Sequence, residues 1–179
     1  MSKISPLAFI DPEAKIGENC EIGPFCFIDK NVEIGDNNVL MNSVSVLYGA
    51  RIGNGNVIFP GAVISAVPQD LKFRGEDTTA EVGDNNKIRE NVTINRGTAA
   101  KGKTCVGSGN LLMESVHVAH DAFVGNDCII GNGTKLAGEI IIDDQFKCTG
   151  SCFIRCIDCN RAQYSCFTTD SDIFFVNGL

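Results

Sequence analysis

A chain of 179 residues, of which 44% are hydrophobic and 21% charged, is long enough to bury one core. Its formal net charge of −7 argues against nucleic-acid binding, which needs a basic surface, and no apolar run is long enough for a membrane span. The N-terminus lacks the apolar segment of a secretory signal, so we expect a cytoplasmic protein.

An aliphatic residue recurs at every sixth position from Ile10 to Ile142. The frame holds Ile, Leu or Val at 20 of 23 positions, and the residue two earlier is usually small, as Ala14 and Cys26 are. Two inward side chains two residues apart, followed by a corner of Gly, Asp or Asn, indicate a short strand and a tight turn. An α-helix would repeat near 3.6 residues instead.

Three six-residue sides make one coil of a triangular prism. Stacked coils place their strands in parallel and bury columns of β-branched side chains. Corners such as GENC, GDNN and GNGT supply the Gly and Asn residues that tolerate positive φ. The sequence therefore predicts an all-β protein whose residues 1–146 form a hexapeptide-repeat parallel β-helix. A β-sandwich with chance spacing is disfavoured, because the frame keeps its phase from Ile10 through to Ile142.

The frame is interrupted in three places. Residues 66–80, around PQDLKFRGED, predict a loop thrown out from a corner, and a shorter basic interruption runs from Gly97 to Lys103. After Ile142 the Gly and Asn corners vanish, so we expect residues 147–179 to be an atypical Cys-rich tail with poor order. Without a secretory signal, no disulfide framework is expected among its five cysteines.

The two histidines of the chain, His117 and His120, lie in one segment, NLLMESVHVAHDAFVG. Val116 and Val118 take the inward positions, so both imidazoles are expected to point out of the prism. An exposed His beside Asp121 can serve as a general base, because a carboxylate orients the ring and stabilises its protonated form. A plain hydrogen-bonding role remains the alternative. Two histidines are too few for a three-His zinc site, so no metal and no cofactor is expected.

Several longer strings resemble the UDP-N-acetylglucosamine acyltransferase family. They cover about four fifths of the chain and are IGPFCFI at 22–28, VEIGDNNVL at 32–40, PQDLKFRGE at 68–76, IRENVTINRGT at 88–98, SGNLLMESVHVAHDAFVGN at 108–126 and LAGEIIIDD at 136–144. The QDLK loop combined with HVAHD is the specific part. The resemblance implies a left-handed β-helix, and this chain lacks a counterpart of the family's C-terminal helical domain.

The resemblance also implies an activity, the first step of lipid A biosynthesis. The family transfers a 3-hydroxyacyl chain from acyl carrier protein to the 3-hydroxyl of UDP-N-acetylglucosamine, at sites between the subunits of a homotrimer. By resemblance His120 is the general base, Asp121 orients it, and the backbone N–H of Gly138 stabilises the oxyanion. The residues that would line the substrate pocket are Gln69, Asp70, Lys72 and His117.

The chain departs from the family pattern in a few places. Asn95 replaces a common His, Glu139 replaces a His that some members carry, and Arg155 and Cys156 stand where an HQFC string begins. We expect the tail to be the frameshifted or otherwise aberrant end of a truncated gene product with reduced or no activity, or else a genuine short paralogue. Two other functions stay open: another hexapeptide acyltransferase or acetyltransferase, and a non-catalytic, oligomerising β-helix.

Overall fold

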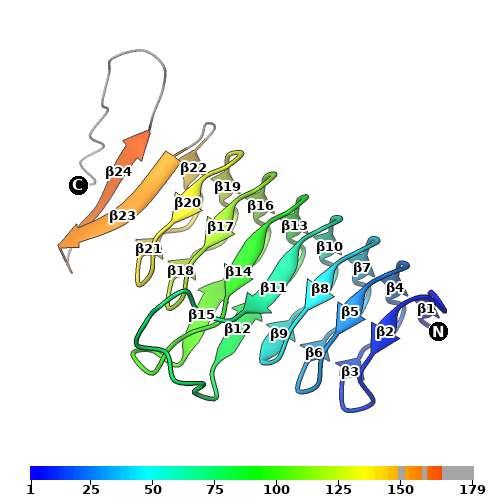
Figure 1. The fold of residues 1–179 in the computed structure, drawn as a ribbon. Helices are drawn as coiled ribbons and strands as arrows, with labels where there is room; N and C mark the ends of the chain where they lie inside the picture. The colour runs from blue at the N-terminus through cyan, green and yellow to red at the C-terminus, as the bar shows by residue number, and fades with distance from the viewer. Residues whose placement is uncertain (149–151, 159–160, 167–179) are drawn as a thin grey trace.

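Short parallel strands wound into a column make up the protein (Figure 1). A computed structural model describes residues 1–148, 152–158 and 161–166, and this part contains 24 strands and no helix. The fold is a left-handed parallel β-helix: the six-residue repeat predicted the parallel β-helix, and the family resemblance implied its hand. No segment of the described chain forms a helix long and apolar enough to cross a membrane.

The strands lie in three sheets, one for each side of the prism. Sheet A contains β1 (Lys3–Ile4), β4 (Glu21–Ile22), β7 (Val39–Leu40), β10 (Val57–Ile58), β13 (Lys87–Ile88), β16 (Leu111–Leu112), β19 (Ile129–Ile130) and β22 (Lys147–Cys148). Sheet B contains β2 (Phe9–Ile10), β5 (Phe27–Ile28), β8 (Ser45–Val46), β11 (Val63–Ala66), β14 (Thr93–Asn95), β17 (His117–Val118), β20 (Lys135–Leu136), β23 (Cys152–Asp158) and β24 (Arg161–Cys166). Sheet C contains β3 (Lys15–Ile16), β6 (Glu33–Ile34), β9 (Ala50–Ile52), β12 (Thr79–Val82), β15 (Lys103–Val106), β18 (Phe123–Val124) and β21 (Ile141–Ile142).

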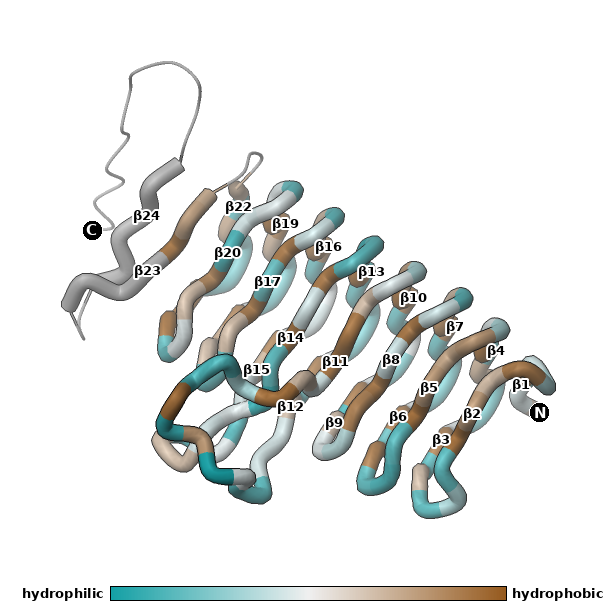
Figure 2. Tube along the Cα trace, in the orientation of Figure 1, coloured by the Kyte–Doolittle hydropathy of each residue, from teal (hydrophilic) through white to brown (hydrophobic). Residues whose placement is uncertain are grey.

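The aliphatic frame forms the core. Ile28, Ile58 and Ile94 are completely buried, and each contacts the equivalent residue one coil away because the strands pair in register. Burying one such side chain contributes roughly 1.5–3 kcal/mol relative to leaving it exposed. Figure 2 shows the resulting pattern along the trace, with brown apolar segments in the strands and teal polar segments at many corners.

The corners have a constant backbone geometry. One residue of almost every corner has positive φ, and the position recurs at every sixth residue, as in Asn19 (56°), Phe25 (60°) and Asn31 (55°). Many corners begin with a glycine for a second reason: successive coils touch there, and a side chain would not fit between them. A Cβ added to Gly35 would lie 2.8 Å from the carbonyl oxygen of Gly53, which a side chain does not tolerate.

A ladder of four buried asparagines runs inside the column, at the inward position that precedes the aliphatic residue by two. The backbone N–H and the side-chain NH₂ of Asn56 both donate to Oδ1 of Asn38, over 2.8 and 3.0 Å. Asn86 binds Asn56 in the same way, and the N–H of Asn110 donates to Oδ1 of Asn86 over 2.8 Å. The last oxygen, Oδ1 of Asn110, accepts the Cys128 N–H over 2.7 Å, so all four amide oxygens are satisfied and can be buried.

Both internal interruptions are insertions at the same corner, between sheets B and C. The asparagine ladder reports their lengths, because its hydrogen-bonded partners are separated in sequence by 18 at the first step, 30 at the second and 24 at the third. An uninterrupted coil spans 18 residues, so the second and third steps contain insertions of twelve and six residues. Both preserve the sixfold phase, since Ala80 still pairs with Ala50 and Val106 with Val82. We name them the long loop (residues 67–78) and the short loop (residues 96–102).

The two loops lie against each other. Thr78 of the long loop donates its hydroxyl to the carbonyl of Gly97 in the short loop over 2.7 Å, and Thr79 N donates to the carbonyl of Gly102 over 3.0 Å. The Asn95 side chain, at the end of β14, donates to the carbonyl of Val67 over 2.6 Å. In Figure 1 the long loop projects from the column beside β15.

The coil pairing continues past residue 146. Cys148 pairs with Ile130, and Ile154, which is fully buried, pairs with Leu136. Cys148 and Cys152 occupy inward positions and are joined by a disulfide, a local pairing that the expectation of no disulfide framework did not include. β24 then pairs antiparallel with β23. The expectation of poor order for the tail falls partly on residues 149–151, 159–160 and 167–179, which lie outside the described residues.

The inward and outward positions of one strand give a matched test of the core. Ile142 is fully buried whereas its neighbour Ile141 is 57% exposed. We expect Ile142→Ala to lower the free energy of unfolding by roughly 2–5 kcal/mol, because it leaves a cavity. Ile141→Ala should change it by less than about 1 kcal/mol. Urea unfolding followed by circular dichroism measures both, and equal losses would contradict the assigned phase.

Candidate active site

The His120–Asp121 pair occupies the corner after β17. The Nδ1 atom of His120 lies 2.8 Å from Oδ2 of Asp121, and the side chains are 18% and 0% exposed, respectively. Asp121 is the positive-φ residue of this corner, with φ of 60°. Because Asp121 N donates to the hydroxyl of Thr104 over 2.8 Å, the backbone at the corner is held from inside the column.

The Asp121 carboxylate is bound by the short loop. Thr98 donates its backbone N–H to Oδ1 over 2.9 Å and its hydroxyl to Oδ2 over 2.6 Å. Burial raises the pKa of Asp121, but the hydrogen bonds from Thr98 and His120 together lower it by more, so the pKa lies below the usual value for Asp. An ionised carboxylate can only accept hydrogen bonds. His120 therefore carries its proton on Nδ1 and presents the Nε2 lone pair as a base.

Gly138 lies directly against the His120 ring from the next coil. A Cβ added to Gly138 would fall 2.8 Å from both Cε1 and Nε2 of that ring. The two corners are also joined by a backbone hydrogen bond, because Glu139 N donates to the carbonyl of His120 over 3.0 Å. No hydrogen bond within the described part of the chain uses the Gly138 N–H.

His117 lies on the outer face of sheet B, as its phase predicts. It pairs with Thr93 on one side and Lys135 on the other, and its Nδ1 is 2.7 Å from the Thr93 hydroxyl. Burial lowers the pKa of His117, and the charges of Lys135 and His120 lower it further. His117 is therefore neutral at pH 7, able to donate and accept hydrogen bonds at the same time.

The predicted substrate residues of the long loop are not bonded to the histidines within the described part of the chain. Gln69 and Lys72 are exposed, and Oδ1 of Asp70 accepts the Lys72 N–H over 2.8 Å in a local turn. Within the residues that the structure describes, no hydrogen bond or ion pair joins these three side chains to His117 or His120. One chain thus brings His120, Asp121 and Gly138 together and leaves the loop residues as a second group.

Arg96 attaches the long loop to the column. Its backbone N–H donates to the carbonyl of Ala66 over 2.9 Å, and its guanidinium lies over the rings of Phe73 and Tyr48 at 5.3 and 5.7 Å. Tyr48 in turn donates its hydroxyl to Asp77 over 3.1 Å. These contacts hold the loop that carries Gln69, Asp70 and Lys72.

The sequence did not predict the contacts of Thr98 and Arg96. The one signal near them was the interruption of the aliphatic frame between Gly97 and Lys103, shortly before the HVAHD segment. That interruption did not show which residues the inserted segment contacts, because the path of an insertion does not follow from the period.

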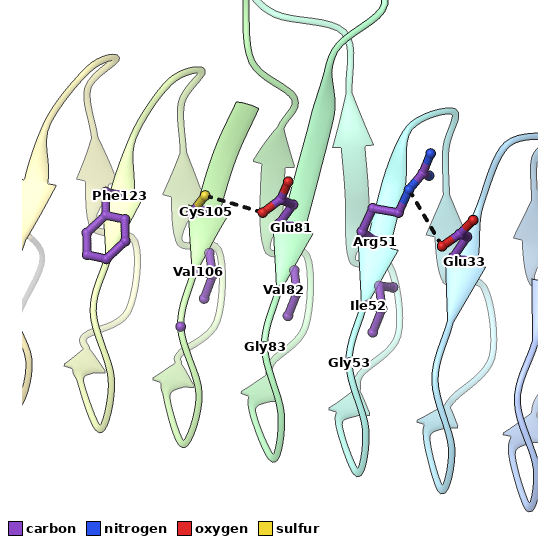
Figure 3. A pocket seen from close by; sticks show the side chains of 11 residues that line it. Glu33, Arg51, Ile52, Gly53, Glu81, Val82, Gly83, Cys105, Val106 and Phe123 are labelled. Atoms are coloured by element: carbon purple, nitrogen blue, oxygen red, sulfur yellow. Dashed lines mark hydrogen bonds and ion pairs between the residues drawn. The ribbon is translucent and has the colours of Figure 1, made fainter. Parts of the chain in front are cut away.

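An open hollow of about 430 Å³ lies elsewhere, on sheet C (Figure 3). None of the predicted site residues lines it. Its charged side chains face one another: Arg51 is 3.9 Å from Glu33, and Glu81 binds Lys103 at 2.9 Å beside Cys105. The hollow therefore offers no concentrated charge to an ionic ligand.

The His120 corner combines a base, a buried acid that orients it and a backbone N–H donor. This set suffices for attack of a hydroxyl on a carbonyl carbon. Among residues 1–148 and the described part of the tail, no group of three or more His, Cys, Asp or Glu side chains is arranged to hold a metal ion.

Comparison with solved structures places the fold and its sequence in one group of enzymes. A scan against protein-family models found no match. The UDP-N-acetylglucosamine acyltransferase of Bacteroides fragilis is 73% identical, with a TM-score of 0.77, over 79% of this chain and 55% of that one. The Francisella novicida enzyme is 43% identical, with a TM-score of 0.77, over 79% of this chain and 52% of that one.

A third structure is matched over more of its own length. The corresponding enzyme of Acinetobacter baumannii is 33% identical, with a TM-score of 0.73, over 91% of this chain and 73% of that one. The chain thus spans about half the length of the first two relatives and nearly three quarters of the third. With 73%, 43% and 33% identity over at least 79% of this chain, the chain belongs to the UDP-N-acetylglucosamine acyltransferase family.

Proposed function

We propose that the chain transfers a 3-hydroxyacyl group from acyl carrier protein to the 3-hydroxyl of UDP-N-acetylglucosamine, the first step of lipid A biosynthesis. The observation that carries the proposal is the His120 ring, which is bound by a buried carboxylate on one side and covers Gly138 on the other. Family membership supplies the substrate class. We place the reaction in the cytoplasm, where both substrates occur.

The geometry supports the following chemistry. Nε2 of His120 accepts the proton of the sugar 3-hydroxyl while its oxygen attacks the thioester carbonyl, and Asp121 stabilises the imidazolium that forms. The carbonyl oxygen becomes an oxyanion, to which the Gly138 N–H donates. When the intermediate collapses, the carbon–sulfur bond breaks, and the imidazolium returns the proton to the leaving thiolate. The products are the sugar ester and the free thiol of the carrier protein.

The second group of residues is proposed to bind the sugar nucleotide. Gln69, Asp70 and Lys72 project polar atoms from a loop that Arg96 fixes to the column. Lys72 is suited to a phosphate, and Asp70 is suited to sugar hydroxyls. His117, neutral and half-buried on the face next to His120, would complete the pocket. Since the described residues show no hydrogen bond or ion pair between this loop and His120, we propose that a site formed between two subunits unites the two groups.

An acyl-transfer assay tests the proposed function. The chain is incubated with UDP-N-acetylglucosamine and 3-hydroxyacyl carrier protein, and the acylated sugar nucleotide is measured by mass spectrometry. We expect His120→Gln to lower kcat by about 10²–10⁴-fold, because the general base is lost.

The matched variant His117→Gln should mainly raise KM for the sugar nucleotide. Circular dichroism must show both variants folded. Activity that survives His120→Gln would remove this residue from the mechanism, whereas a folded wild-type chain without transfer would favour a non-catalytic β-helix.

Gly138→Ala tests the close contact with the ring. The new methyl group cannot occupy its position unless the imidazole moves, because the separation would be only 2.8 Å. A displacement of about 1 Å costs on the order of 10²-fold in rate. We expect that loss in kcat with a nearly unchanged unfolding midpoint. The nearby corner substitution Glu139→Gln, which adds no atom toward the ring, should retain activity within a few-fold; equal losses in both variants would contradict the assigned contact.

We propose that the protein assembles as a homotrimer with its sites between subunits. Light scattering coupled to size exclusion should then give three times the chain mass of 19.2 kDa. A monomeric mass at assay concentrations, combined with full activity, would show that one chain holds the complete site.

A further inference from the structure

The short loop between β14 and β15 reaches across two successive coils at the His120 corner. We infer that Lys101, at its tip, is a positioning residue that fixes the spacing between the His120 ring and the Gly138 N–H. The inference deepens the proposed function and rests on it for its catalytic consequence.

The contacts of Lys101 are directed at backbone. Its Nζ lies 3.2 Å from the carbonyl oxygen of Asp121 and 3.1 Å from the carbonyl oxygen of Glu139. These two residues occupy the same corner position in consecutive coils, with φ of 60° and 63°. One ammonium group therefore bridges the corner that carries the base and the corner that carries the oxyanion donor. Hydrogen bonds from a charged donor are stronger than those between neutral groups.

The backbone of the short loop holds Lys101 in place. Gly102 N donates to the carbonyl of Thr98 over 2.7 Å, and Ala100 N donates to the Thr98 hydroxyl over 3.2 Å, so the loop is a closed turn. Thr98 is itself fixed by its two hydrogen bonds to the Asp121 carboxylate. Two residues of the short loop thus bind the same corner. Thr98 binds the side chain of Asp121, and Lys101 binds its backbone carbonyl.

The contacts of Lys101 differ from those of an ordinary surface lysine, which pairs with a carboxylate. Lys101 is an exposed residue, and within the described residues it forms no ion pair with a carboxylate, not even with Glu139, whose backbone it binds. The neighbouring Lys103 is the contrast, because its ammonium pairs with the Glu81 carboxylate at 2.9 Å on sheet C. The two lysines therefore provide a test and a matched control within one segment.

The geometry indicates which kinetic constant depends on Lys101. The spacing between base and oxyanion donor affects the transition state, in which both act on the same carbonyl, more than it affects binding of either substrate. Lys101 itself touches neither the ring nor the Gly138 N–H in the described contacts. Its loss should therefore lower kcat and leave KM for the sugar nucleotide unchanged.

The experiment compares Lys101→Met, Lys101→Arg and the control Lys103→Met in the full chain. Kinetics are measured with UDP-N-acetylglucosamine and 3-hydroxyacyl carrier protein, and amide exchange is measured by NMR. We expect Lys101→Met to lower kcat by about 10-fold at constant KM, since small displacements of reacting groups are costly. It should also lower the exchange protection of the Glu139 amide, which donates to His120, by about 10-fold. Lys101→Arg should keep most of kcat and most of the exchange protection at Glu139. Lys103→Met should change neither kcat nor that protection.

The outcomes separate the inference from the proposed function. Unchanged protection at Glu139 in Lys101→Met, or lowered protection with unchanged kcat, would overturn the inference. Protection lost evenly across all coils would also overturn it, because it would show a global effect. If the wild-type chain transfers no acyl group, the proposed function fails, and the Glu139 exchange alone decides whether Lys101 sets the spacing of the two corners.

Discussion

Parallel, in-register pairing between successive coils is the constraint on which the rest of the structure depends. It places each aliphatic residue on the equivalent residue of the neighbouring coil, and fully buried side chains such as Ile58 and Ile94 follow. The same register stacks the corners, so a residue at one corner always faces the corresponding residue of the next. His120 lies against Gly138 because both belong to one such stack. The proposed active site is thus a local variation on a contact that the whole column repeats.

The fold could be predicted in most respects because its determinants are local and periodic. The aliphatic frame predicted the phase of each strand, and the Asn and Gly corners predicted positive φ at residues such as Asn19. The C-terminal end of the coil pairing was harder to see. Cys148 and Cys152 fill inward positions there, but the loss of the Gly and Asn corners after Ile142 hid the continuing repeat. The buried ladder from Asn38 to Asn110 was not predicted either, because a polar residue normally indicates an exposed position.

In the candidate site, too, the local features could be predicted from the sequence and the long-range contacts could not. The outward direction of His117 and the pairing of His120 with Asp121 follow from phase and adjacency, and the structure shows both. The role proposed for Gly138 came from resemblance, whereas its position beside the His120 ring comes from the structure. The contacts of Thr98 and Lys101 join parts of the chain that are distant in sequence through a non-repetitive loop. Neither the period nor the composition contains that information, so only coordinates could supply it.

The lengths of the two insertions have a consequence for how this gene can change. Twelve and six extra residues are two whole repeats and one whole repeat of the six-residue side. An insertion absorbed within the column would turn the later aliphatic side chains away from the axis unless its length were a multiple of six residues. Both insertions meet this condition, so the strands that follow them keep their inward residues in the same columns.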